Sequence, residues 1–193
     1  MRMIRRTRFF SLLVVAIVFA QNAGAIPVGG VLHDSYSGTF DTGFGLAVVD
    51  CEVYAYTSGE FVYTYRISNN STIGFSFFSV GIPEGGDAWS PSVDSDPISG
   101  YVDPVFWTVA GSPVQSVDYL FADTIDNTET SALLWFVSSH TSHLGGGTLF
   151  GRNVSTTGDL LTPIPEPATF LLLGTAGLWI LTRKRRSALK TKN

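Results

Sequence analysis

The sequence predicts a mainly β protein whose folded part is an antiparallel β-sandwich. Phe61, Tyr63, Tyr65 and Ile67 alternate with other residues at a period of two, which is typical of a strand with one buried face. Similar short runs recur between clusters of Gly, Pro, Asn and Asp. Between the two ends of the chain no segment keeps a helical period. Several short strands at this spacing favour a sandwich.

The strands can be placed in chain order. Leu46–Tyr56 and the strand from Phe61 flank four turn residues, 57–60, and should pair as a hairpin. Further strands are expected at Ile73–Ile82, Tyr101–Val109, Val117–Phe121, Ser131–Ser139 and Thr148–Val154. The segment 83–100 is too rich in turn residues for a simple hairpin, so we expect a long loop there, with Trp89 against the edge of the core. Gly145-Gly-Gly147 is expected to form a turn.

Charge is strongly segregated along the 193 residues. All 16 Asp and Glu residues lie between Asp34 and Glu166, whereas only Arg66 and Arg152 of the 12 Lys and Arg residues lie there. Positive ends around an acidic middle are typical of a protein whose middle crosses a membrane. An acidic middle also argues against nucleic acid as a partner, because binding requires Lys and Arg to neutralise phosphates.

The first residues have the three parts of a secretory signal peptide. The first eight residues contain four arginines, the last of which is Arg8. The stretch Phe9–Ala20 is apolar, and small residues follow at Ala23 and Ala25. Twelve apolar residues in a helix reach about 18 Å, which is short of the roughly 30 Å hydrocarbon core of a bilayer. We therefore predict a cleavable signal helix over residues 1–25, cut after Ala25 once the secretory translocon has engaged it. The β-rich exported domain is expected over residues 26–154.

The C-terminal part has a second membrane-directed pattern. Residues 155–167 lack an apolar pattern and are expected to form a linker, and residues 168–182 form an uncharged stretch suited to a single transmembrane helix. A basic cluster follows, which should stop translocation and remain in the cytoplasm as part of the tail 183–193. This cluster consists of Arg183, Lys184, Arg185 and Arg186.

The C-terminal part has three features in order: Pro165, Glu166 and Pro167, then an apolar run with Gly174 and Gly177, and then the basic cluster. In this order the three features resemble the PEP-CTERM sorting signal, also described as an ice-binding-protein-type C-terminal domain. The resemblance implies export by a Gram-negative bacterium and processing near Pro-Glu-Pro by an exosortase, a membrane cysteine protease. It further implies delivery to the cell surface or to an exopolysaccharide matrix. An unprocessed single-pass membrane anchor would have the same topology.

Candidate chemistry in the middle of the chain is sparse. His140 and His143 are separated by two residues and suggest, as an alternative, a secreted hydrolase or a metal site, although no further ligands are evident. Asp41-Thr-Gly43 matches the aspartic protease tripeptide but occurs once, so a turn is the favoured interpretation. The acidic runs at 94–96 and 123–129 lack the order of a calcium-binding loop. Cys51 is expected to be a buried structural thiol.

The sequence therefore favours a non-enzymatic protein without catalytic residues, metal or cofactor. We expect it to cross the inner membrane, to be anchored at least transiently by its C-terminal helix, and then to reach the cell surface or extracellular matrix. The predicted partners are the secretory translocon, an exosortase and exopolysaccharide.

Overall fold

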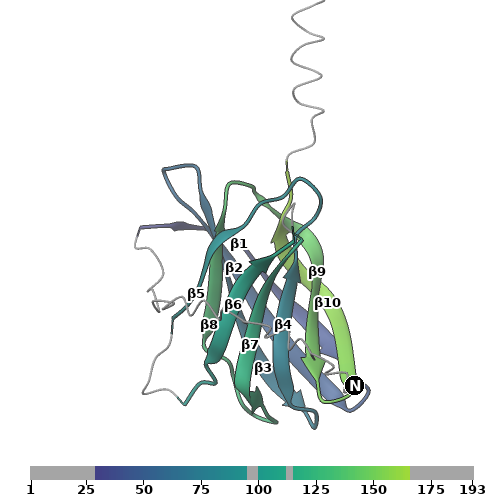
Figure 1. The fold of residues 1–193 in the computed structure, drawn as a ribbon. Helices are drawn as coiled ribbons and strands as arrows, with labels where there is room; N and C mark the ends of the chain where they lie inside the picture. The colour runs from purple at the N-terminus through teal and green to yellow at the C-terminus, as the bar shows by residue number, and fades with distance from the viewer. Residues whose placement is uncertain (1–28, 95–99, 112–114, 166–193) are drawn as a thin grey trace, which may run out of the picture.

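A computed structural model describes residues 29–94, 100–111 and 115–165, which form two antiparallel sheets of five strands each (Figure 1). The first sheet, sheet A, has the order β1-β2-β3-β8-β5, and the second, sheet B, has the order β10-β9-β4-β7-β6. The strands are β1 (Val31–Asp41), β2 (Gly45–Ala55), β3 (Phe61–Ser71), β4 (Phe75–Gly81), β5 (Trp89–Asp94), β6 (Pro104–Ala110), β7 (Ser116–Ile125), β8 (Leu133–Ser138), β9 (Ser142–Gly151) and β10 (Val154–Pro163). The predicted mainly β fold of two antiparallel sheets is confirmed.

The core lies between the sheets because one face of each central strand is apolar. On β3, Tyr63, Tyr65 and Ile67 are fully buried, as their period of two predicts. Sheet B contributes buried residues such as Phe78 and Tyr119, and the ring of Phe78 packs edge-on against Tyr65 at 5.7 Å between centroids. The two inner faces therefore form one continuous aromatic core.

Buried tyrosine hydroxyls tie the two sheets together. Tyr65 of sheet A donates a hydrogen bond to the carbonyl of Leu161 on β10 at 2.7 Å. Tyr119 of sheet B donates to the carbonyl of Trp135 on β8 at 2.9 Å. Burial raises the pKa of each phenol well above the ordinary value for tyrosine. Both side chains therefore remain neutral donors that satisfy a carbonyl of the opposite sheet.

Glycine lets the two sheets approach closely where β1 faces β10. A Cβ atom built on Gly38 would lie 2.2 Å from the carbonyl oxygen of Asp159, and one on Gly158 would lie 2.9 Å from that of Thr39. Distances this short leave no space for a side chain. The sandwich is therefore closed along this edge by backbone against backbone.

Three strands were not expected from the sequence. β1 was not predicted at all, and β5, which begins at Trp89, lies inside the segment predicted as the long loop 83–100. Trp89 does pack against the outer apolar cluster of Val62, Trp135 and Val137. The main correction concerns β10, because residues 155–163 of the predicted linker form most of this strand and bury Leu160 and Leu161.

Gly145-Gly-Gly147 also differs from the prediction, because these residues lie within β9 and not in a turn. Their missing side chains make room for neighbours on β10. A Cβ on Gly145 would lie 2.1 Å from the hydroxyl of Thr162, and one on Gly147 would lie 2.1 Å from a methyl group of Leu160. The absence of side chains at Gly145 and Gly147 therefore allows Leu160 and Thr162 of β10 to pack there.

The predicted signal peptide (residues 1–25) and transmembrane helix (residues 168–182) lie outside the described residues. Within the described ranges, the structure contains no helix long and apolar enough to cross a bilayer.

Candidate functional site

The end of β10 is where the folded sandwich meets the Pro-rich segment singled out in the sequence. The strand ends at Pro163, and the next amide, that of Ile164, donates a hydrogen bond to the carbonyl of Thr141 at 3.1 Å. Pro165 lies against Gly85, where an added Cβ would be 3.1 Å from the proline ring. The chain is thus held against the folded domain up to Pro165.

Two glycines in the loop after β4 make this contact possible. Gly85 has a φ of +85°, a conformation that favours glycine, and a Cβ on Gly86 would lie 3.0 Å from the carbonyl oxygen of Pro163. The amide of Gly86 also donates to the carbonyl of Pro83 at 2.9 Å, which closes a tight turn. The loop therefore presents its backbone to the end of β10, and we call this contact, residues 83–87 with 163–165, the exit contact.

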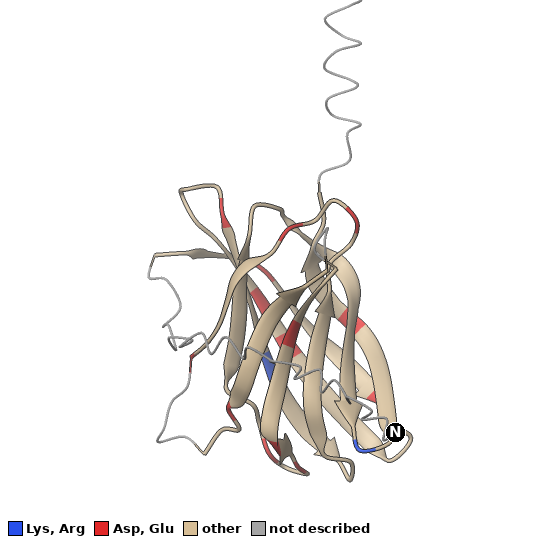
Figure 2. Ribbon diagram, in the orientation of Figure 1, with Lys and Arg blue, Asp and Glu red and all other residues tan. Residues whose placement is uncertain are grey.

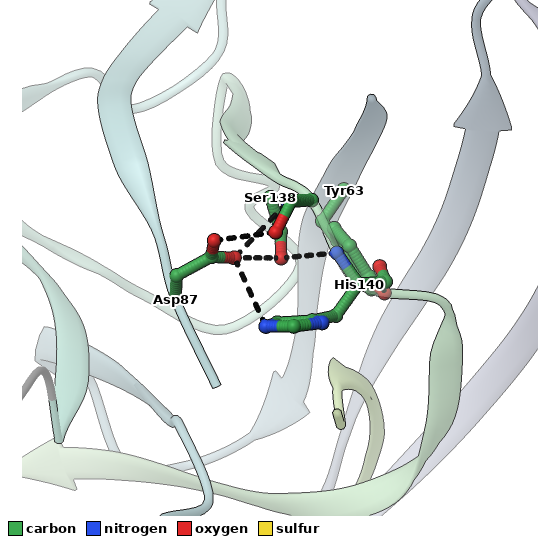
Figure 3. A network of polar contacts seen from close by, with 5 residues as sticks. Tyr63, Asp87, Ser138 and His140 are labelled. Carbon is green, nitrogen blue, oxygen red and sulfur yellow. Dashed lines mark hydrogen bonds and ion pairs between the residues drawn. The ribbon is translucent and has the colours of Figure 1, made fainter. Parts of the chain in front are cut away.

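Asp87 fixes the same loop to the turn between β8 and β9 (Figure 3). Its carboxylate accepts hydrogen bonds from the hydroxyls of Ser138 and Ser139, both at 2.6 Å, and from the amide of Ser139 at 3.0 Å. The imidazole of His140 lies 3.9 Å from the same carboxylate. The side chain of Tyr63 adds a bond from its hydroxyl to the carbonyl of His140 at 2.9 Å.

The electrostatics of Asp87 reflect these contacts. Burial acts to raise the pKa of the carboxyl group, but the hydrogen bonds from Ser138 and Ser139 and the nearby charge of His140 outweigh it, so the pKa lies below its usual value. The charged form is therefore the one that the loop is built to hold. This carboxylate is an anchor for the loop.

The geometry around His140 differs from that of a Ser-His-Asp triad. In a triad the imidazole lies between the carboxylate and the nucleophilic hydroxyl. Here the hydroxyls of Ser138 and Ser139 donate directly to Asp87, while the amide of His140 donates to the hydroxyl of Ser138 at 3.1 Å. The contacts fix a turn, and neither Ser138 nor Ser139 donates its hydroxyl to the imidazole ring.

His143, the second histidine singled out in the sequence, does not join this network. It is exposed on β9, where it lies opposite Thr162, and its contacts do not include Asp87. In the described part of the chain, no group of three or more His, Cys, Asp or Glu side chains is placed to hold a metal ion.

The other sequence candidates have structural roles. Asp41-Thr-Gly43 forms the turn between β1 and β2, in which the carboxylate of Asp41 accepts from the amide of Gly43 at 2.8 Å and the hydroxyl of Thr42 donates to the carbonyl of Gly45 at 2.9 Å. Cys51 is a free, buried thiol, and burial raises its pKa to about 12. Asp126 and Glu129 close the turn after β7, where the amide of Asp126 donates to the Glu129 carboxylate at 2.7 Å.

Of the residues assigned to sorting, Pro165 is described and lies in the exit contact. The remaining ones lie outside the described residues: Ala23 and Ala25 at the signal cleavage site, Glu166 and Pro167 of the motif, and Arg183, Lys184, Arg185 and Arg186. Asp87 and its serine partners were missed, because residues about fifty positions apart in sequence form no recognisable motif.

Comparison with protein families gives one result, a match of residues 163–186 to the PEP-CTERM protein-sorting motif. No curated protein and no solved structure matches the chain. The matched segment begins at Pro163, which is also the last residue of β10. It therefore starts at the exit contact and includes the whole Pro165-Glu166-Pro167 element together with the basic cluster.

The motif suggests an exported protein that an exosortase sorts. The resemblance seen in the sequence is confirmed over the residues that carried it. The chain thus carries a PEP-CTERM protein-sorting motif that follows directly on the last strand of a β-sandwich.

Proposed function

We propose that this chain is an exported, non-enzymatic surface protein whose β-sandwich is delivered by exosortase processing to the cell surface or to an exopolysaccharide matrix. The observation that carries the proposal is the match over residues 163–186 at the end of the last strand. A sorting signal in this place makes the sandwich the delivered cargo.

The position of the motif supports processing that leaves the folded domain intact. Because β10 pairs with β9 as far as Pro163, a cut on the C-terminal side of Pro165 removes no residue of the sheet. The exit contact also limits how far a protease can reach, since residues up to Pro165 are packed on the loop 83–87. A protease that needs an extended substrate would therefore have to displace the exit contact to bind the chain before Pro165.

The contacts around Asp87 support a binding or structural role for the domain over the hydrolase alternative. The one described carboxylate beside His140 is committed to three hydrogen bonds that hold a turn. In a catalytic triad the carboxylate orients the histidine that acts as the general base, whereas here it holds the loop. The polysaccharide association rests on the implied destination of the sorting route and on the acidic, hydrogen-bonding surface of the domain.

Replacement of Pro165, Glu166 and Pro167 with alanine tests the proposal in a host that contains an exosortase. We expect the wild-type domain to be released from the membrane fraction and the triple variant to remain there with its tail. The matched control replaces Lys190, Thr191 and Lys192, three residues beyond the matched segment, and should be processed normally.

Three outcomes would overturn parts of the proposal separately. Equal release of the triple variant would exclude motif-dependent sorting. Retention of both proteins in the membrane would support the unprocessed single-pass anchor. Hydrolytic activity of the released wild-type domain that is lost in His140→Ala would support the hydrolase alternative.

A further inference from the structure

The outer face of sheet A carries a shallow polar cleft of about 530 Å³. Its side chains come from the three neighbouring strands β1, β2 and β3, and those that matter are Ser35, Ser37, Asp50, Glu52, Thr64 and Arg66. Small-molecule sites in proteins have volumes of about 300 to 1,000 Å³. The cleft is thus large enough for a small ligand and lies away from the exit contact.

Arg66 is unusual among the cleft residues. It is one of two Lys or Arg residues in the described ranges, and Figure 2 shows that blue segments are few on the ribbon whereas red acidic segments are spread over it. Its guanidinium lies 5.0 Å from the centre of the Tyr101 ring, which fixes its position by a cation–π contact. Its Nε atom is buried and has no hydrogen-bond partner. Because an atom without accessible surface cannot meet a ligand, any hydrogen bond that Arg66 donates into the cleft comes from its other guanidinium nitrogens.

The nearest acidic residue in the sheet does not satisfy Arg66. Asp50 is its direct partner in the register between β2 and β3, yet no ion pair joins these two described residues. Directly opposed side chains have Cβ atoms about 4.5 to 5.5 Å apart, so such a pair would be within easy reach. Both residues line the cleft, so the two opposite charges face it without forming an ion pair.

Neighbouring hydroxyl groups hold the two carboxylates in place. Ser37 donates to Asp50 at 2.5 Å, and Tyr54 donates to Glu52 at 2.6 Å. Each carboxylate has about four acceptor positions, so these single bonds leave most of its capacity free. The cleft therefore offers fixed acceptors on β2 and a fixed donor on β3, side by side.

We propose that this cleft binds a neutral polyhydroxylated ligand, namely a segment of an uncharged saccharide chain. A hydroxyl group both donates and accepts, so two adjacent hydroxyls can donate to Asp50 or Glu52 and accept from Arg66 at once. A carboxylate-bearing sugar fits less well, because two acids outnumber the single cation. The inference rests on the proposed function in that it assigns the surface by which the delivered domain contacts a polysaccharide.

The test is binding of the purified full-length protein in mild detergent to immobilised neutral oligosaccharides of glucose, mannose and galactose, with uronic acid oligosaccharides alongside. We expect Arg66→Lys and Glu52→Gln each to weaken binding to the neutral chains at least tenfold, equivalent to about 1.4 kcal/mol. Arg66→Lys keeps the charge but removes the planar fork of guanidinium N–H donors. Asp118→Asn, an acid on sheet B that pairs with Ser79, should bind as the wild type does.

Thermal unfolding of each variant separates a lost site from a lost fold. A folded wild-type protein that binds none of the neutral chains would overturn the inference, as would equal binding by the two cleft variants. Preferential binding of uronic acid chains would overturn the assigned ligand class. Sorting is tested separately, by the replacement of Pro165, Glu166 and Pro167. A protein that fails to bind oligosaccharides would therefore leave the proposed sorting intact, and a protein that is not sorted could still be tested for oligosaccharide binding.

Discussion

Replacing Asp87 with alanine should weaken the attachment of the loop 83–87 to the β8–β9 turn. The change removes three hydrogen bonds, two from hydroxyls and one from an amide, together with the contact to His140. A hydrogen bond contributes about 0.5 to 1.5 kcal/mol net to stability, more with a charged partner. The side chain of Asp87 is 37% exposed, so water replaces part of the loss. We therefore expect about 1 to 2 kcal/mol.

The assay is thermal unfolding of the purified full-length protein at pH 7. For a domain of this size a loss of 1 to 2 kcal/mol lowers Tm by about 3 to 6 °C. The matched control is Glu84→Ala, which removes an exposed carboxylate from the same loop and should change Tm by less than about 1 °C.

The effect of Asp87→Ala must also depend on pH. The folded state lowers the pKa of the Asp87 carboxyl group. The charged carboxylate therefore contributes its full stabilisation of the fold above the ordinary Asp pKa of about 3.9, and this stabilisation is lost as the pH falls through the lowered pKa of the folded state. The difference between wild type and variant should therefore shrink as the pH falls below the ordinary Asp value and through the lowered one. An unchanged Tm at pH 7, or a difference that persists undiminished in acid, would refute the role assigned to this carboxylate.

Three further predictions concern the core. Gly38→Ala should destabilise the fold by about 1 to 3 kcal/mol in urea unfolding, because its Cβ would meet the backbone of β10, whereas Gly146→Ala, with nothing within 4 Å, should not. Tyr65→Phe should cost about 1 to 2 kcal/mol in the same assay by leaving the carbonyl of Leu161 unpaired, and an equal effect of Tyr54→Phe, on the exposed face, would contradict this. Cys51, with a pKa raised to about 12, should resist iodoacetamide at pH 8 until the protein unfolds, and rapid labelling of the folded protein would disprove its burial.

The fold class could be predicted from the sequence because the central strands alternate cleanly. β2 and β3 appear within a few residues of their predicted limits, since each buries one face and has a turn with Gly59 between them. β1 and β10 could not be found this way. Each is an edge strand, and their inner positions include Gly38 and Gly158, whose small size suits the contact between the sheets and carries no hydrophobic signal.

The sorting motif could be recognised because its residues are contiguous, whereas the exit contact could not. That contact joins the loop 83–87 to the end of β10, and Asp87 fixes the same loop to the β8–β9 turn; only the register of both sheets brings these segments together. The polar cleft was missed for a similar reason. Asp50 and Arg66 are sixteen positions apart in sequence, and only the register of β2 and β3 places them opposite each other.

The most direct test of the account is the mass of the mature protein recovered from an exosortase-containing host. The account predicts a C-terminus close to Pro165-Glu166-Pro167, on a domain that retains all of β10 and lacks the basic cluster. Recovery of the surface protein with Asn193 still attached would contradict it.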